Sequence, residues 1–311
     1  MTDVLGIHHV TAIAGDPREN LAFYTGLLGM RLVKRSVNQD DPGTYHLFYA
    51  DAEGNPGTDL TFFPWPHLPA GRLGTGLTGE VMLAVPQGAV RYWAERLAAA
   101  GVHSGPLEER FGERALLVTD PHGMAIALVE TEAERRFSPW EASPVPADKQ
   151  VRGIHGVRLW EESLGPSRKL LEDVFGFSLQ ASVGEWHRFV PTGGSSGGVV
   201  DVREAGGVGR GVMGRGSVHH VAFRVPDDAA HGRARARVLA AGHRPTPVID
   251  RFWFKSVYFS EPGGVLFELA TDGPGFAVDE DPAHLGEHLV LPPWLESDRE
   301  RIEAMLPSLD G

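Results

Sequence analysis

Two adjacent histidine pairs and one isolated glutamate are the residues of this chain whose types and spacing could hold a metal ion. The pairs are His8-His9 and His219-His220, and Glu268 lies inside an otherwise apolar run. The chain has no cysteine, so histidine and carboxylate side chains are its only common strong metal ligands. The chemistry to consider first is therefore that of a metal bound by imidazole and carboxylate groups.

Strand parity selects one histidine from each pair, because neighbouring side chains in a strand point to opposite faces of the sheet. In the second pair, His219 shares its face with an apolar row, whereas His220 lies on the opposite, open face. The same parity places His9 and Thr11 together near the start of the chain. Glu268 alternates with apolar neighbours and therefore also faces the open side.

His9, His220 and Glu268 together would supply two imidazoles and one carboxylate, provided that their strands face one cavity. This is the donor set of the facial triad that binds non-haem Fe(II) and leaves positions for substrate and O₂. The alternative interpretation is structural, since a histidine at the start of a strand is more often a packed or hydrogen-bonded residue. A glutamate in an apolar strand favours the metal site, because a buried carboxylate is costly unless it is ligated, paired or protonated.

Four more side chains are candidates for a role near such a metal. Tyr258 has the parity of the open face and could donate or accept a proton, and Arg251 could hold an anionic phenolate or carboxylate. Their alternative roles are a half-buried strand aromatic and a surface arginine. His8 and His219 have the wrong parity for direct ligation but could orient their neighbours, and His219 could also help to move a proton.

A β-α-β-β-β pattern occurs four times along the chain. The copies open at Ile7, Val81, Ile154 and His219, and a proline-containing stretch without periodicity separates the second copy from the third. We therefore expect an N-terminal domain at 1–135, a linker at 136–152, a C-terminal domain at 153–275 and a tail at 276–311 with one helix inside 293–306.

Aligning the copies with one another shows which of them keep the metal-ligating residues. In the second copy, Ala127 stands at the place of the closing-strand glutamate, and Glu80 at the place of the fourth copy's second histidine. In the third copy, Gly156 takes the place of the first copy's second histidine. The first and fourth copies alone keep the full ligand set, and we interpret Glu80 as a structural residue.

Composition and charge argue against several classes of protein. The 311 residues include 29 Lys plus Arg and 41 Asp plus Glu, a formal net charge of −12, which disfavours binding to nucleic acid or to an anionic membrane. The sequence contains no transmembrane-length apolar run and does not start with a signal-peptide pattern, so we expect a soluble, cytoplasmic protein. The aromatic segment at 293–295 could dock on another subunit or fold back onto its own chain. In the first case the protein would be a homo-oligomer.

The module pattern and three segments of the sequence resemble the vicinal oxygen chelate superfamily. The segments are Ile7 to Thr11, Phe23 to Met30 and Phe267 to Leu269. This superfamily includes glyoxalase I, bleomycin-resistance proteins and extradiol dioxygenases. The resemblance covers residues 6–272 and implies an α+β fold, in which four β-α-β-β-β modules form two tandem domains of cup-shaped mixed sheets with the helices outside.

A more specific resemblance is to the branch of ring-cleaving dioxygenases that act on hydroquinones. It rests on the segments Arg31 to Asn38, Asp41 to Leu47 and Gly54 to Thr58. Matching positions imply that Fe(II) is bound by His9, His220 and Glu268, and that the pocket residues are His8, Thr11, His219, Arg251 and Tyr258. The chain departs from the catechol-cleaving relatives at Gly156 and has no histidine between 199 and 218, which argues against a catechol substrate.

The resemblance implies an extradiol-type, Fe(II)-dependent dioxygenase that opens a small 1,4-dihydroxylated aromatic ring with O₂, with Mn(II) or another divalent ion as the alternative metal. Two other functions stay open. One is a glyoxalase-like isomerase or lyase that uses a divalent metal as a Lewis acid. The other is a metal-free protein that sequesters an aromatic compound. Removal of Glu268 would abolish activity in either enzyme but would leave the affinity of a binding protein intact.

Overall fold

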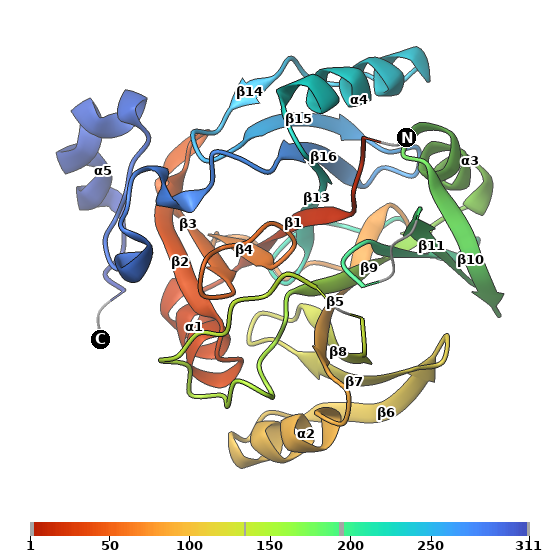
Figure 1. Ribbon diagram of the computed structural model, residues 1–311, viewed down its shortest axis with the longest axis horizontal. Helices are drawn as coiled ribbons and strands as arrows, with labels where there is room; N and C mark the ends of the chain where they lie inside the picture. The colour runs from red at the N-terminus through yellow and green to blue at the C-terminus, as the bar shows by residue number, and fades with distance from the viewer. Residues whose placement is uncertain (1–2, 134, 193–195, 310–311) are drawn as a thin grey trace.

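The computed structural model describes residues 3–133, 135–192 and 196–309, and two mixed eight-stranded sheets form its framework (Figure 1). The first sheet contains β1 (Ile7–Ala14), β2 (Arg31–Asn38), β3 (Asp41–Ala50), β4 (Asp59–Pro64), β13 (Val218–Val225), β14 (Ile249–Asp250), β15 (Lys255–Ser260) and β16 (Leu266–Thr271). The second contains β5 (Leu77–Pro86), β6 (Ser104–Arg110), β7 (Glu113–Thr119), β8 (Ala125–Thr131), β9 (Ile154–Glu161), β10 (Phe177–Val183), β11 (Trp186–Pro191) and β12 (Val199–Glu204).

One helix follows the opening strand of each module and lies outside the sheets (Figure 1). The helices are α1 (Pro17–Leu21) with a π-helical continuation (Ala22–Leu27), α2 (Val90–Ala99), α3 (Leu164–Lys169) with a π-helical continuation (Leu170–Val174), and α4 (Asp228–Ala240). Side-chain caps start two of them, since Asp16 accepts from the Arg18 backbone N–H and Asp227 from that of Ala230. In the described part of the chain, no helix is long and apolar enough to cross a membrane.

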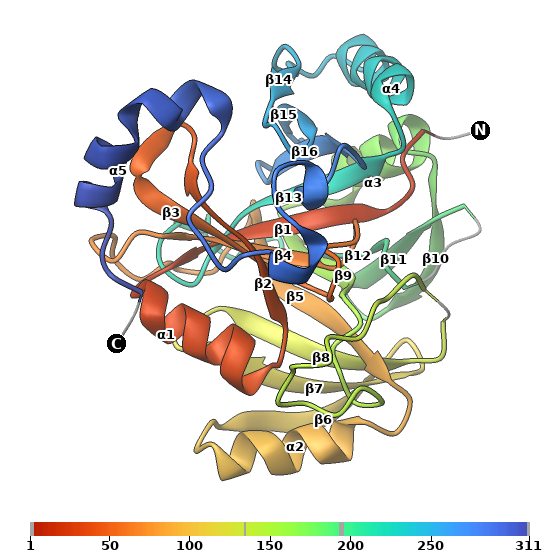
Figure 2. The same cartoon turned by 60° about the vertical axis from the view of Figure 1, so that its left-hand side comes forward.

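The expected α+β fold of four β-α-β-β-β modules is confirmed, and the sheets show how the modules associate. The first sheet has the order β14-β15-β16-β13-β1-β4-β3-β2, and the second has the order β10-β11-β12-β9-β5-β8-β7-β6. Modules one and four therefore share one sheet, and modules two and three share the other. The opening strands β1 and β13 run antiparallel, side by side, through the middle of the molecule (Figure 2). The division into domains at 1–135 and 153–275 stays a prediction, because each sheet joins modules from both halves.

The strand register repeats between the two sheets. In the first sheet, Ala222 on β13 is paired with His9 on one side and with Glu268 on the other. Met82 on β5 holds the same place in the second sheet, and its partners are Gly156 and Ala127. The alignment of the copies in sequence is thus reproduced by the hydrogen-bonded pairing of their strands.

The hydrophobic core lies between the sheets and their helices. On β13, Val221, Phe223 and Val225 are fully buried in this core, together with Val238 of α4. The intervening Ala222 belongs to a separate apolar cluster on the concave side of the first sheet. This alternation confirms that the helix-covered and open faces follow strand parity.

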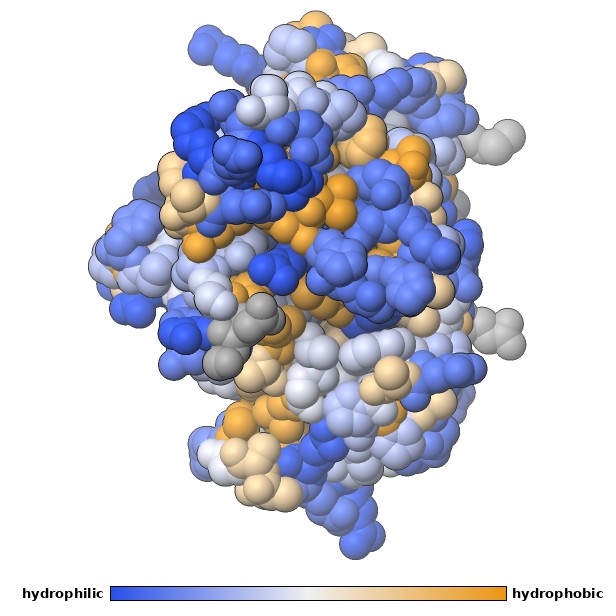
Figure 3. Space-filling model, turned by 90° about the vertical axis from the view of Figure 1, so that its left-hand side faces the viewer, coloured by the Kyte–Doolittle hydropathy of each residue, from blue (hydrophilic) through white to orange (hydrophobic). Residues whose placement is uncertain are grey.

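The C-terminal tail folds back over β2 and β3. It contains 3₁₀ segments at Phe276–Val278, Pro282–His284 and Pro293–Asp298, and then α5 (Arg299–Met305). Lys34 of β2, which has no exposed surface, anchors the tail by pairing with Asp279 at 2.7 Å and with Glu280. On the face that carries α5, hydrophilic side chains dominate, and hydrophobic ones show in patches between them (Figure 3).

Two buried carboxyl groups meet where the sheets adjoin. Glu161 ends β9 of the second sheet, and Glu261 lies in the β15–β16 turn of the first. Glu161 has no exposed surface, and neither of its carboxylate oxygens has a hydrogen-bond partner among the described residues. Burial, and then the neighbouring carboxyl of Glu261, raises the pKa of Glu161 to about 9.

This raised pKa predicts that the protein loses stability as the pH rises. The folded chain keeps a proton that the unfolded chain releases above its ordinary pKa of 4.5, so the free energy of unfolding falls between about pH 4.5 and 9. Because one pKa unit corresponds to about 1.4 kcal/mol, we expect Glu161→Gln to raise the free energy of unfolding by at least about 1 kcal/mol near pH 8 and by much less near pH 5.

Urea unfolding at the two pH values measures this difference. The matched control is Glu162→Gln, because Glu162 is the next residue along the chain and is exposed. Equal pH dependence of the Glu161→Gln variant and the unaltered protein would contradict the assignment.

Candidate metal centre

Three adjacent strands, β16, β13 and β1, bring Glu268, His220 and His9 to one point on the concave face of the first sheet. The Nε2 atoms of the two histidines lie 3.3 Å apart. Glu268 Oε2 lies 3.3 Å from His9 Nε2 and 3.0 Å from His220 Nε2. All three side chains are buried, so the three atoms converge on a space that the protein shields from solvent.

This convergence fits a divalent metal better than a hydrogen-bonded cluster. Glu268 Oε2 accepts no hydrogen bond of acceptable geometry from the described residues, although it is buried. Atoms that bind a common cation at about 2.1 Å lie roughly 3.0 to 3.4 Å apart, depending on the coordination angle. Two imidazoles and one carboxylate also match the ligand preference of Fe(II) and related ions. Within the described ranges, this is the one cluster of three such groups that could hold a metal.

The surroundings of the Glu268 carboxylate keep it ionised and hold one of its two oxygens in place. Burial raises its pKa, but His9 and then His220 outweigh burial and hold the pKa well below the ordinary value, so the group is ionised. The second oxygen, Oε1, accepts a hydrogen bond of 2.5 Å from Ser256 Oγ. Sequence reasoning missed Ser256, although it has the same strand parity as Tyr258 and could have been found by that signal.

His8 and His219 lie behind the two ligand candidates rather than in the pocket. The Nδ1 atom of His8 lies 2.9 Å from that of His9, and the Nδ1 atom of His219 lies 2.8 Å from that of His220. Burial, followed by the charge of the adjacent histidine, lowers the pKa of both His8 and His219 to about 3. As neutral rings, His8 and His219 can accept from the Nδ1–H groups of His9 and His220, and in that tautomer the Nε2 lone pairs of His9 and His220 are free for a metal.

Tyr258 and Arg251, two further residues singled out from the sequence, line the same pocket as His9 and His220. Tyr258 is directly opposite Glu268 in the β15–β16 pairing. Burial, and then the charge of Glu268, raises the pKa of Tyr258, so its phenol stays protonated at neutral pH. The Arg251 guanidinium carbon lies 5.5 Å from the centre of the Tyr258 ring, and this places a cation beside a proton donor.

Thr11 is buried but lies outside the pocket lining. Its hydroxyl oxygen lies 2.7 Å from that of Thr61, which is 2.9 Å from His46 Nε2. His46 does line the pocket. In the sequence, His46 falls within the segment Asp41 to Leu47. It shares one face of β3 with Phe48, and this parity is the signal that could have identified it. Burial, and then the charges of the ligand histidines, lowers the pKa of His46 well below its ordinary value, so His46 is a neutral polar group of the pocket.

Aromatic side chains and a surface contact enclose the remaining space. The pocket is lined by His9, Asn38, Gln39, Asp40, His46, Phe48, Phe63, His220, Arg251, Trp253, Phe254 and Tyr258, and its volume is about 40 Å³. Arg251 pairs with Asp40 at 2.8 Å, and its backbone oxygen accepts from Gln39 Nε2 at 2.9 Å. These two contacts connect the β2–β3 turn to the β14–β15 loop across the pocket.

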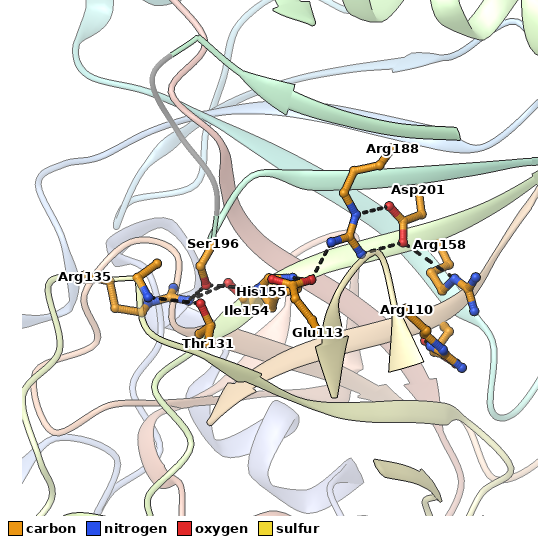
Figure 4. A network of polar contacts seen from close by, with 12 residues as sticks. Arg110, Glu113, Thr131, Arg135, Ile154, His155, Arg158, Arg188, Ser196 and Asp201 are labelled. Carbon is orange, nitrogen blue, oxygen red and sulfur yellow. Dashed lines mark hydrogen bonds and ion pairs between the residues drawn. The ribbon is translucent and has the colours of Figure 1, made fainter. Parts of the chain in front are cut away.

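On the second sheet, charged side chains pair with one another and apolar side chains pack together. Glu80 is paired with Arg110 at 2.5 Å, which agrees with its interpretation as a structural residue. Arg188 binds Asp201 through two hydrogen bonds of 2.7 and 3.0 Å and also contacts Glu113 (Figure 4). Apolar side chains occupy the rest, namely Met82, Ala115, Ala127, Val129, Val190 and Val199.

Comparison with known proteins supplies independent information. Residues 6–128 and 153–269 match the model of the Glyoxalase/Bleomycin resistance protein/Dioxygenase superfamily. A protein of Bacillus subtilis (strain 168), provisionally named ring-cleaving dioxygenase MhqO, is 42% identical over 97% of this chain and 96% of its own length. The chlorohydroquinone/hydroquinone 1,2-dioxygenase of Sphingobium indicum is 31% identical over 96% of this chain and 95% of its own. A crystal structure of a B. subtilis protein, provisionally described as a dioxygenase, matches with a TM-score of 0.93 and 41% identity, and covers 99% of this chain and 98% of that one.

The hydrogen bond from Ser256 to Glu268 predicts a measurable contribution to metal binding. Groups that orient a metal ligand typically change metal affinity by about 10- to 100-fold, so we expect Ser256→Ala to weaken Fe(II) binding by that factor. Anaerobic competition with a chelating dye measures the affinity. Ser260→Ala is the matched control, because Ser260 is exposed on the same strand. Equal affinities of the two variants would show that Ser256 has no such role.

Proposed function

The chain belongs to the Glyoxalase/Bleomycin resistance protein/Dioxygenase superfamily, and from that premise we propose that it is a ring-cleaving dioxygenase that uses Fe(II) and O₂ to open a hydroquinone-type ring. The names of its relatives support ring cleavage. The hydroquinone substrate is proposed on the name of the S. indicum relative and on the sequence segments described above. Extradiol-type cleavage and iron as the physiological metal are parts of the same proposal.

The observation that carries the proposal is the buried convergence of two imidazole nitrogens and one carboxylate oxygen inside an aromatic pocket. His9, His220 and Glu268 would hold the metal, and the pocket that His9 and His220 line would hold the substrate and O₂. Fe(II) in this site would supply Lewis acidity toward a phenolate and electrons for O₂.

The remaining pocket residues would bind and orient the substrate. Phe48, Phe63 and Phe254 line the cavity and would contact the faces and edges of an aromatic ring. Arg251 would stabilise a negative charge on a substrate oxygen, because its guanidinium lies in the pocket wall and is only 15% exposed. Enclosure of the site would exclude bulk water from reactive species.

Proton transfer would be handled by the protein's own donors. Tyr258 holds its proton at neutral pH, since its pKa is raised, and lies within the pocket beside Arg251. It can therefore donate a hydrogen bond or a proton to a substrate oxygen. His8 and His219 are positioning residues here, because their contacts are with the ligand histidines; a direct role of His219 in moving protons stays part of the proposal.

Oxygen consumption tests the proposed activity directly. Protein reconstituted anaerobically with Fe(II) is expected to take up one O₂ for each hydroquinone ring that is lost, and little or none with catechol. Glu268→Gln is expected to abolish this uptake, because the site loses its one anionic ligand. The control is Glu80→Gln, since Glu80 is a glutamate of the second sheet, holds the place of His220 there and is paired with Arg110.

Each alternative function has a distinct result in this experiment. Isomerisation of a substrate without oxygen uptake would favour the glyoxalase-like enzyme. Binding of aromatic compounds that persists in Glu268→Gln, with no turnover by the unaltered protein, would favour a metal-free binding protein. Either result would overturn the proposal.

The role of Tyr258 predicts a loss of turnover without a loss of metal. Proton transfer by a positioned side chain typically contributes about 10²- to 10⁴-fold, so we expect Tyr258→Phe to lower kcat by at least about 100-fold. Iron content should stay unchanged, because Tyr258 is not among the ligand candidates. Tyr92→Phe on the distant helix α2 is the control. A Tyr258→Phe enzyme with unaltered kcat would rule out the proposed proton donor.

A further inference from the structure

A second cavity, of about 160 Å³, lies where the two sheets are joined and shares no lining residue with the metal pocket. It is enclosed by the start of β5, by the β7–β8 turn, and by the crossing segments that precede β5 and β13. None of its lining residues is an aspartate or a glutamate. The lining residues that can carry a positive charge are Arg215 and His122.

The two crossing segments hold Arg215 in place. Isolated bridges pair Ala70 with Arg215 and Arg72 with Val212. The Arg215 backbone N–H donates to Pro69 at 2.9 Å, and its carbonyl oxygen accepts from Gly71 at 2.9 Å. The backbone at Arg215 is thus fixed on both sides, while its side chain lines the cavity.

Three side chains of the cavity have donor groups without acceptors. The buried Nε atom of Arg215 has no hydrogen-bond partner in the described structure, and none of the described carboxylates forms an ion pair with its guanidinium. The side chain of His122 is only 3% exposed, yet neither ring nitrogen has a hydrogen-bond partner among the residues described. Thr78 is 6% exposed, and its hydroxyl is likewise unpartnered in the described ranges.

Two of these side chains, those of Arg215 and His122, lie close to each other, and Thr78 lines the same cavity. A Cβ atom built on Gly15 would lie within 3.4 Å of both the His122 ring and the Arg215 side chain, so these two side chains flank the same point. The neighbouring carboxylates do not satisfy them. Glu19 Oε2 is 3.5 Å from His122 Nε2 and belongs to a side chain that is 66% exposed, and Asp120 accepts instead from backbone N–H groups and from Tyr24.

We propose that this cavity binds a small oxyanion, through a phosphate or a carboxylate group, with Arg215, His122 and Thr78 as its hydrogen-bond donors. Buried donors are normally paired, and an acceptor-only, negatively charged group in this cavity would supply the acceptor that these side chains lack. The planar guanidinium of arginine suits the oxygens of either ligand.

The cavity lies beside the junction between modules one and four. Ser217, which lines the cavity, accepts through its backbone oxygen from the Ile13 N–H at 2.9 Å. It immediately precedes β13, and Ile13 lies in β1. The cavity therefore lies beside the backbone hydrogen bond that connects the end of β1 to the segment before β13. This inference rests on contacts away from the metal pocket and does not depend on the proposed function.

Calorimetric titration of the full-length protein with inorganic phosphate, and separately with acetate, tests the site at constant ionic strength in chloride. We expect one binding site, with the same affinity in metal-loaded and metal-free protein. Arg215→Gln should raise the dissociation constant at least tenfold, and Thr78→Val should raise it several-fold. Arg72→Gln is the matched control, because Arg72 is an exposed arginine of the partner crossing segment and should leave the affinity unchanged.

The two anions distinguish the sources of the ligand, since tighter binding of phosphate indicates a phosphorylated compound and tighter binding of acetate a carboxylic acid. The proposal is overturned if neither anion binds more strongly than chloride, if binding requires the metal, or if Arg215→Gln and Arg72→Gln bind equally well. If Arg215→Gln does not fold, Thr78→Val provides the same comparison, because valine keeps the shape of the side chain and removes the hydroxyl.

Discussion

The buried charge of Glu268 is the constraint on which the rest of the structure depends. An ionised carboxylate with no exposed surface is unfavourable unless cations, metal or hydrogen-bond donors surround it. The chain meets this requirement with imidazoles from two modules whose ligand histidines are 211 residues apart in sequence and with the hydroxyl of Ser256. The pairing of β1 with β13, and of β13 with β16, brings the three side chains together, so the cluster depends on the formation of the first sheet.

The second sheet has the same strand arrangement but no buried glutamate at the place of Glu268, where Ala127 stands. Its register around Met82 repeats the register around Ala222, but glycine and alanine stand at two of the ligand places. Apolar side chains close the cavity, and the charged groups pair with one another (Figure 4). Four similar modules thus produce one pocket with a convergent His-His-Glu cluster and one counterpart occupied by paired charges and apolar side chains.

Local patterns were sufficient to predict the parts of the site that depend on strand parity. The choice of His9 over His8, of His220 over His219, and the inward direction of Glu268 and Tyr258 all follow from the alternation of faces. Features set by distant contacts were not accessible in this way. The pairing of modules one and four, and the fastening of Arg251 to Asp40 across the pocket, depend on strand order and on the β14–β15 loop, where Phe252 adopts a φ of 74°.

The central claim is that one metal ion lies between His9, His220 and Glu268. Anomalous X-ray diffraction at the iron absorption edge, from crystals of protein reconstituted with Fe(II), tests this claim most directly. The account predicts one strong anomalous peak within bonding distance of His9 Nε2, His220 Nε2 and a Glu268 carboxylate oxygen, and no comparable peak in the second sheet. A peak elsewhere with this position empty, or no peak in crystals that contain stoichiometric iron, would contradict it.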